Sequence, residues 1–172
     1  VGEDSDLHDQ FLLRKYEWEI KLGRLGPDTA AAILTLGEKL QTESQRIMFL
    51  SPIVRALIWR GRIQEAKQVL ALFEQNFHPA LKDRVKAEYY LTRGIMETGA
   101  ARPNYLLQGR NIALKLRDHN LISKMDIELG QYYHSNEQPF VALYYLLDGA
   151  SRIKEIIKTL PEQYRPHFFR TY

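Results

Sequence analysis

The sequence of 172 residues contains no cysteine. This absence excludes disulfide bonds, thiolate zinc sites and a cysteine nucleophile from the printed chain. The chain also lacks an apolar run near the roughly 20 residues that a membrane-spanning helix needs, and it does not open with a signal-peptide pattern. These absences fit a protein of the reducing cytoplasm, and we expect no membrane insertion.

An excess of charge of one sign is missing as well. The chain has 24 Lys and Arg residues against 21 Asp and Glu residues, so the formal net charge is only +3. A nucleic-acid binder concentrates its cations on one face or in one run, whereas the cations of this chain are scattered. We therefore interpret them as solvated helix faces and keep a helical-repeat RNA or DNA binder as a distant alternative.

Motifs of catalysis are absent from the sequence. It has no glycine-rich phosphate loop, no nucleophile elbow and no His-Glu-x-x-His pair. The sequence has five histidines that are far apart, and no two of them are at helical spacing. They are His8, His78, His119, His134 and His167. We expect no enzyme activity, no cofactor and no metal site.

Helical periodicity runs through almost the whole chain. Val69, Leu70, Phe73 and Phe77 recur three to four residues apart, as the apolar face of a helix requires. Alternating strand patterns and Asn-Gly or Asp-Gly hairpin signals are missing. With 45% apolar residues available for a core, the sequence predicts an all-α fold with strand content near zero.

Prolines, glycines and capping residues divide this pattern into eight helices. Thr42 and Gln45, for example, have the spacing of a capping box. Short connections make sequential helices antiparallel, so the helices pair into four hairpins within one domain, residues 1–172. We predict helices at about 5–23, 27–42, 44–60, 63–76, 80–98, 103–118, 120–135 and 139–159. The hairpins are then about 5–42, 44–76, 80–118 and 120–159, followed by an exit segment, 160–172.

An internal repeat appears when the hairpins are aligned. Its clearest unit is Leu129-Gly130, followed by Tyr133 three residues after the glycine and by Ala142 twelve residues after it. Gly130 and Ala142 are small where two helices have to cross closely, and Tyr133 is large where the hairpin needs filling.

The other hairpins follow the same register less fully. Val54 and Gly94 stand where Gly130 stands, which gives steps of 40 and 36 residues. Gly61 takes the turn position of the second hairpin, and Ala66, Leu70 and Phe73 take its next core positions. The first hairpin has candidate core positions at Trp18, Ala31 and Leu34, and its register stays open.

On these residues the chain resembles the tetratricopeptide-repeat superfamily over nearly its full length. The resemblance implies a right-handed superhelical stack of about four antiparallel hairpins, in which the first helix of each hairpin lines a concave face. The long repeat spacing looks like that of arrays in bacterial transcription regulators of the maltose-activator type and in repeat-bearing sensor kinases or diguanylate cyclases. Both ends of the sequence look cut, because it begins at Val1 without a methionine and ends in an aromatic cluster. We therefore expect a segment of a larger protein.

The register implied by this resemblance selects side chains for the concave face. Arg55 and Lys124 would pair with carboxylates of a bound peptide, and Trp59 would anchor an apolar side chain. Alternatively, Trp59 is core, the two cations are solvated and His134 is a surface residue. The predicted partner-binding set is Met48, Arg55, Trp59, Glu88, Thr92, Lys124, Gln131 and His134.

A further feature leaves alternatives open. Three pairs of adjacent tyrosines could pack in the core with their hydroxyl groups reaching water, or they could stack on RNA bases. The pairs are Tyr89-Tyr90, Tyr132-Tyr133 and Tyr144-Tyr145.

The leading functional hypothesis is a non-catalytic scaffold or sensor module, within a signal-transduction or transcription-regulatory protein, that binds a protein or peptide. The alternative is a module that self-associates into a homodimer through an open end or its convex face.

Overall fold

The structure is a computed structural model that describes residues 2–24, 26, 28–74 and 77–165. All regular structure in these residues is helical, with eight α-helices, one short 3-10 helix and no strand. The all-α prediction is therefore confirmed for the described part of the chain. Two compact units are present, Val1–Thr92 and Arg93–Tyr172.

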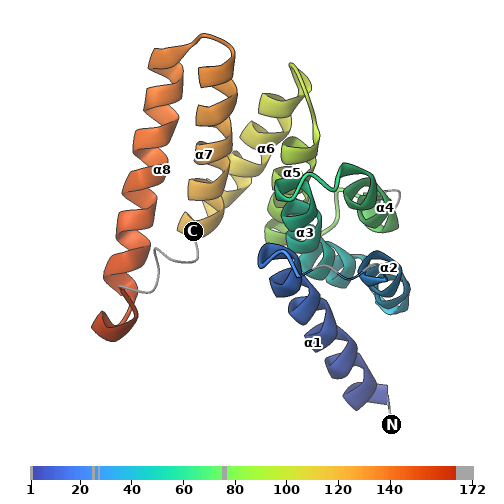
Figure 1. Cartoon of the computed structure of the whole chain (residues 1–172). Helices are drawn as coiled ribbons and strands as arrows, with labels where there is room; N and C mark the ends of the chain where they lie inside the picture. Colours follow the sequence, from blue (N-terminus) through green and yellow to red (C-terminus); the bar gives the residue numbers. More distant parts are fainter. Residues whose placement is uncertain (1, 25, 27, 75–76, 166–172) are drawn as a thin grey trace. The chain divides into compact units, whose positions relative to one another are not determined.

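The first unit contains four complete helices, which Figure 1 labels, and most of a fifth. These helices are α1 (Gly2–Lys21), α2 (Thr29–Lys39), α3 (Glu43–Trp59), α4 (Ile63–Glu74) and α5 (Asp83–Met96). Helix α1 packs on α2 and α3, and α4 packs on α3 and α2. Each helix thus contacts both its hairpin partner and the equivalent helix of the other hairpin, which is the packing of a helical stack.

The core of the first unit consists of side chains that recur at helical spacing. Ile33, Ile47, Leu50 and Phe73 are fully buried, and they come from α2, α3 and α4. The predicted core positions of the second hairpin are confirmed, because Val54, Ala66, Leu70 and Phe73 have at most 2% of their surface exposed. The predicted capping box at the start of α3 is confirmed as well: the Gln45 backbone N–H donates to Thr42 Oγ1 over 3.2 Å, and the Thr42 N–H donates to Gln45 Oε1 over 3.0 Å.

The first hairpin is in a different register from the one suggested by the sequence. Trp18 and Ala31 are exposed. The buried positions lie two residues further along each helix, at Ile20, Ile33 and Leu36. Two residues rotate a helix by about 200°, so Trp18 and Ala31 point to solvent, while Leu34, the third expected core position, is half-buried.

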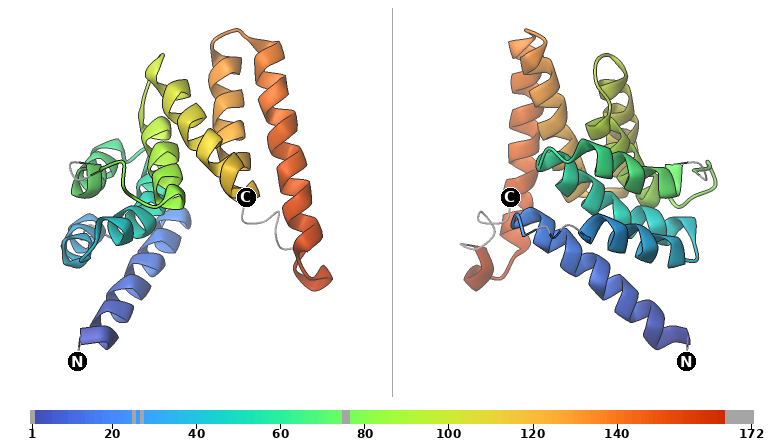
Figure 2. Two further views of the ribbon diagram at one scale, coloured as in Figure 1. Left: turned by 180° about the vertical axis from the view of Figure 1, so that it is seen from behind. Right: turned by 45° about the vertical axis from the view of Figure 1, so that its right-hand side comes forward.

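The second unit is built on α6 (Ala101–Leu116), α7 (His119–Ser135) and α8 (Pro139–Thr159), followed by the 3-10 helix η1 (Glu162–Tyr164). Helix α7 packs against both α6 and α8. The views in Figures 1 and 2 agree that α7 and α8 lie side by side along most of their length. Residues 166–172 of the predicted exit segment lie outside the described residues. So do residues 75–76, at the end of the predicted second hairpin.

Two glycines of the predicted repeat stand at close helix crossings. A Cβ added to Gly94 would lie 2.7 Å from Leu106 Cγ. One added to Gly130 would lie 2.6 Å from Leu146 Cγ and 3.3 Å from the Ala142 carbonyl oxygen. Both crossings join a glycine to the next helix along the chain, Gly94 of α5 to α6 and Gly130 of α7 to α8, so the small residues serve the close approach expected of them.

Candidate interaction surfaces

Three residues of the predicted partner-binding set come together in the first unit. Arg55 Nη1 donates to Glu88 Oε2 over 2.9 Å and to Thr92 Oγ1 over 2.8 Å. Thr92 is fully buried, and both side chains of the ion pair are mostly buried. Since the carboxylate that engages Arg55 belongs to the chain itself, this cluster joins α3 to α5.

Trp59 lies at the end of α3 and is 72% exposed, so it belongs to the surface and not to the core. The guanidinium of Arg60 lies over its ring at 4.8 Å from the centroid. Arg60 Nε also donates to the Ile20 carbonyl oxygen over 3.0 Å, at the carboxyl end of α1. A cation at this end of a helix compensates its partial negative charge. Met48, on the same helix α3, is half-buried.

The remaining predicted residues belong to α7 in the second unit. Lys124 is half-buried, whereas Gln131 and His134 are exposed. Their spacing of seven and three residues places the three side chains on one side of α7. The structure thus brings Arg55, Glu88 and Thr92 into direct contact, and distributes the other predicted residues over α3 and α7.

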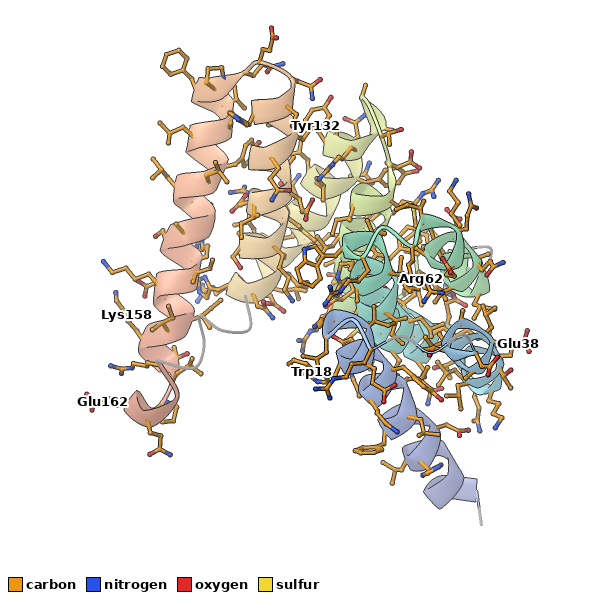
Figure 3. The ribbon with its side chains drawn as sticks, viewed as in Figure 1. Trp18, Glu38, Arg62, Tyr132, Lys158 and Glu162 are labelled. Carbon is orange, nitrogen blue, oxygen red and sulfur yellow. The ribbon has the colours of Figure 1, made fainter. Side chains whose placement is uncertain are left out.

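A stripe of exposed apolar side chains on α1 was not predicted. It consists of Leu7, Phe11 and Trp18 of α1 and of Leu22, directly after the helix, and these side chains are 51–68% exposed. At 100° per residue these four positions fall within about 60° of arc. The buried side of α1, with Leu13 and Ile20, lies opposite, so the helix is apolar on two faces and only one of them is covered. Figure 3 labels Trp18 on this helix.

Cations border the α1 stripe. Arg14 and Lys21 lie on one edge, and both pair with Glu17, at 2.9 Å and 2.7 Å. Lys15 lies on the other edge and pairs with Glu19. Burial alone would raise the pKa of Glu17, but the hydrogen bonds and charges of Lys21 and Arg14 outweigh it and hold the pKa below its usual value. The edges of the stripe thus carry three cations and two carboxylates.

A second exposed apolar stripe, also not predicted, lies on α8. It is formed by Phe140, Leu143, Tyr144 and Leu147, with Phe140 88% exposed and the others 54–61% exposed. These positions span about 100° of arc, and the buried residues Ala142 and Gly149 lie on the opposite side, towards α7. Figure 3 shows Lys158, further along α8, on the side of the helix away from α7.

A charged network lies inside the second unit. Arg110 of α6 donates from Nε to Asp126 Oδ1 over 2.5 Å and from Nη2 to Asp148 Oδ2 over 2.7 Å. Asp126 is fully buried. Its burial and the nearby Asp148 carboxylate raise its pKa to about 6, although Arg110 acts in the opposite direction. The network joins α6, α7 and α8.

The adjacent tyrosines pack mainly on other aromatic rings. Tyr89 is buried and stacks on Phe77 at 3.9 Å between ring centroids. Tyr133 and Tyr145 stack at 5.6 Å with an interplanar angle of 6°, which fills the hairpin between α7 and α8 as the repeat predicts. Tyr144 differs, since it is 61% exposed and belongs to the α8 stripe.

Sequence reasoning missed the two stripes because it cannot tell which of two apolar faces is covered. The spacing of Leu7, Phe11, Trp18 and Leu22 is visible in the sequence, but so is that of Leu13 and Ile20. Both patterns fit an amphipathic helix, and only the packing against α2 and α3 decides between them.

Across the described residues, no helix is long and apolar enough to cross a membrane. The same residues contain no cluster of three His, Asp or Glu side chains arranged to hold a metal ion.

These observations define an all-α class for the described residues, and the helix contacts of the first unit fit a helical stack. Comparisons of the chain with protein-family models, with curated proteins and with solved structures find no match. The fold class therefore rests on the helix contacts themselves, and the likeness to tetratricopeptide repeats rests on the repeat residues of this sequence.

Proposed function

We propose that the chain is a non-catalytic module that binds another protein through the apolar stripe of α1. The observation that carries this proposal is the placement of Leu7, Phe11, Trp18 and Leu22 on the face opposite the packed side of the helix. A contiguous apolar surface with a polar rim marks an interaction site more often than isolated exposed residues do. The exposed Trp18 is the type of residue that dominates binding energy at such sites.

The shape and charge of the stripe favour an amphipathic helix as the bound element. A narrow apolar ridge of about four turns matches the i, i+3, i+4, i+7 face of such a helix. The edges of the stripe carry three cations, Arg14, Lys15 and Lys21, and two carboxylates pair with them, so the edges have a net charge of +1. Acidic residues on the edges of the bound helix would meet these cations, so we propose a partner helix with Asp or Glu beside its apolar face.

The helical stack and its repeat residues suggest the setting of such a module. Similar arrays serve bacterial signal-transduction and transcription-regulatory proteins, and we propose a scaffold or sensor role of that kind in the cytoplasm. Arg55, the cation predicted to hold a ligand carboxylate, is occupied by Glu88. The α1 stripe is therefore a better candidate for the principal site than the neighbourhood of Arg55.

A display selection followed by titration tests the proposal. Helical peptides of about 20 residues are displayed as a library and selected on the full chain, and a selected peptide is then titrated by calorimetry. We expect enriched peptides to have one apolar face with acidic edges. Trp18→Ala should weaken binding by a factor of about 10 or more, because it removes the largest anchor of the stripe.

Trp59→Ala is the matched control, since Trp59 is also an exposed tryptophan and lies on α3. It should leave the affinity unchanged within a factor of about 2. If no helical peptide is enriched, the proposed function is wrong. If Trp59→Ala abolishes binding and Trp18→Ala does not, the site lies on α3 and the assignment to α1 is wrong.

A further inference from the structure

We propose that α8 pairs in antiparallel orientation with α8 of a second copy of this chain, through the stripe formed by Phe140, Leu143, Tyr144 and Leu147. The proposal uses residues of the second unit only and does not depend on the function proposed for α1. It rests on the exposure of the stripe and on the complementary side-chain size and charge at the two ends of α8.

The apolar part of α8 complements itself when one helix is reversed. We place a two-fold axis midway between Tyr144 and Leu147. Tyr144 of each copy then lies beside Leu147 of the other copy. The same axis places Phe140 level with Ser151 of the second copy, beside its exposed Ala150. Phe140, the most exposed ring of the stripe, thus meets small side chains that leave room for it. Positions 140, 144, 147 and 151 follow the alternating four- and three-residue spacing of a helix-pairing seam.

The charged ends of the seam also match in this register. Glu137 lies in the turn just before α8, with a φ of 58°, and this end of α8 comes near Lys154 of the second copy; both side chains are exposed. The symmetry makes this acid–base contact twice. A parallel arrangement would instead place Glu137 beside Glu137 and Lys154 beside Lys154, so charge favours the antiparallel pair.

The area available is sufficient for a weak but specific dimer. If the four side chains of the stripe lost their exposed surface, two copies together would bury about 1,000 Å², which is the lower limit for specific interfaces. Buried area alone does not fix the affinity, so the dimer is tested over a wide range of protein concentrations.

Sedimentation velocity of the full chain tests the proposal, at protein concentrations from about 1 to about 500 µM and about 0.1 M salt. We expect a reversible monomer–dimer equilibrium. Leu147→Glu should leave a monomer at every concentration, because it places one carboxylate from each copy, two in all, near the axis in place of apolar contacts. Trp18→Ala is the control on α1 and should not change the equilibrium.

A charge exchange distinguishes self-pairing from other uses of the same face. Glu137→Lys and Lys154→Glu should each weaken the dimer by a factor of about 3–10, and the double variant should restore it. Thermal unfolding by circular dichroism verifies that each variant is folded. A wild-type chain that stays monomeric at all concentrations overturns the proposal. So does a dimer that Leu147→Glu leaves intact, or a double variant that is no better than the single ones.

Discussion

Asp126 lies in an unusual environment for a carboxyl group, because most carboxyl groups of proteins are exposed to water. It is fully buried, and its Oδ2 has no hydrogen-bond partner among the described residues, while Oδ1 accepts from Arg110. Arg110 also donates to Asp148, so one guanidinium faces two carboxylates. Arg152 lies 3.5 Å from the Asp148 carboxylate. Tyr145 lies against the same guanidinium. The burial of Asp126 and the charge of Asp148 thus favour a proton on Asp126.

The pH dependence of stability follows from this environment. The pKa of Asp126 is about 6 in the folded chain against an ordinary value of 3.8, so the folded state binds the proton more tightly. The resulting stabilisation is fully present below pH 3.8 and is lost as the pH rises through 6. At neutral pH the ionised carboxylate of Asp126 therefore destabilises the second unit.

Asp126→Asn should raise the free energy of unfolding at pH 7–8 by about 1–3 kcal/mol. The amide can still accept from Arg110, it carries no charge, and Arg110 retains Asp148 as a counter-ion. The gain should shrink towards zero near pH 4, where the wild-type carboxyl group is protonated. Thermal unfolding at several pH values measures the difference, and Glu155→Gln serves as a control because Glu155 is an exposed carboxylate. A variant that is less stable than the wild type at pH 8 would contradict this account of the network.

At the residue scale, local pairs were predictable from the sequence and distant pairs were not. The capping box of Thr42 and Gln45 depends on a separation of three residues, and the sequence predicts it correctly. The partner of Arg55 is Glu88, 33 residues further along the chain. The sequence predicts both residues on one face, but it does not show that they bind each other, because that depends on how α3 and α5 pack.

At the scale of the helices, the eight α-helices of the described residues and their order were predicted correctly, whereas the 3-10 helix and several helix ends were not. Helix α2 ends at Lys39, before the predicted residue 42, because Leu40 adopts an extended backbone with ψ of 123° and is buried. Helix α5 begins at Asp83, later than the predicted residue 80. These ends are decided by burial and turn geometry, which the apolar spacing does not record.

The register of the first hairpin shows the same limit. Its two helices are apolar on more than one side, so positions two residues apart compete for the core. The face with Ile20 and Ile33 is buried, and Trp18 remains exposed on the other side of α1. The exposed stripe on α1 is thus a direct result of the packing that the sequence could not resolve.

Gly130→Ala tests whether α7 and α8 depend on their close crossing. The added methyl group would lie 2.6 Å from Leu146 Cγ and close to the backbone at Ala142, so the helices would have to separate. We expect a loss of about 1–3 kcal/mol in the free energy of unfolding, even though alanine favours a helix over glycine. Chemical denaturation measures it, with the exposed Ser151→Ala as a control that should change stability by less than about 0.5 kcal/mol. Equal or greater stability of Gly130→Ala would mean that the crossing tolerates a Cβ.

At the scale of the whole molecule, the all-helical class was predictable because nearly every segment shows the same apolar period. The division into Val1–Thr92 and Arg93–Tyr172 was not predicted, and it falls within α5, where neither a linker nor a change of composition marks it. The short connections between helices predicted the hairpin arrangement. They did not indicate which helix faces remain uncovered, and those faces carry the functional proposal.

Hydrogen–deuterium exchange of the full chain, with and without a peptide selected for binding, tests the central claim most directly. Amides in hydrogen-bonded helices exchange through local opening, so a partner that covers a helix slows exchange there. We predict that the peptide protects amides of α1 between residues 7 and 22 and that Trp18→Ala removes this protection. Protection confined to α3 or α7, with α1 unchanged, would contradict the claim that the exposed stripe of α1 is the binding surface.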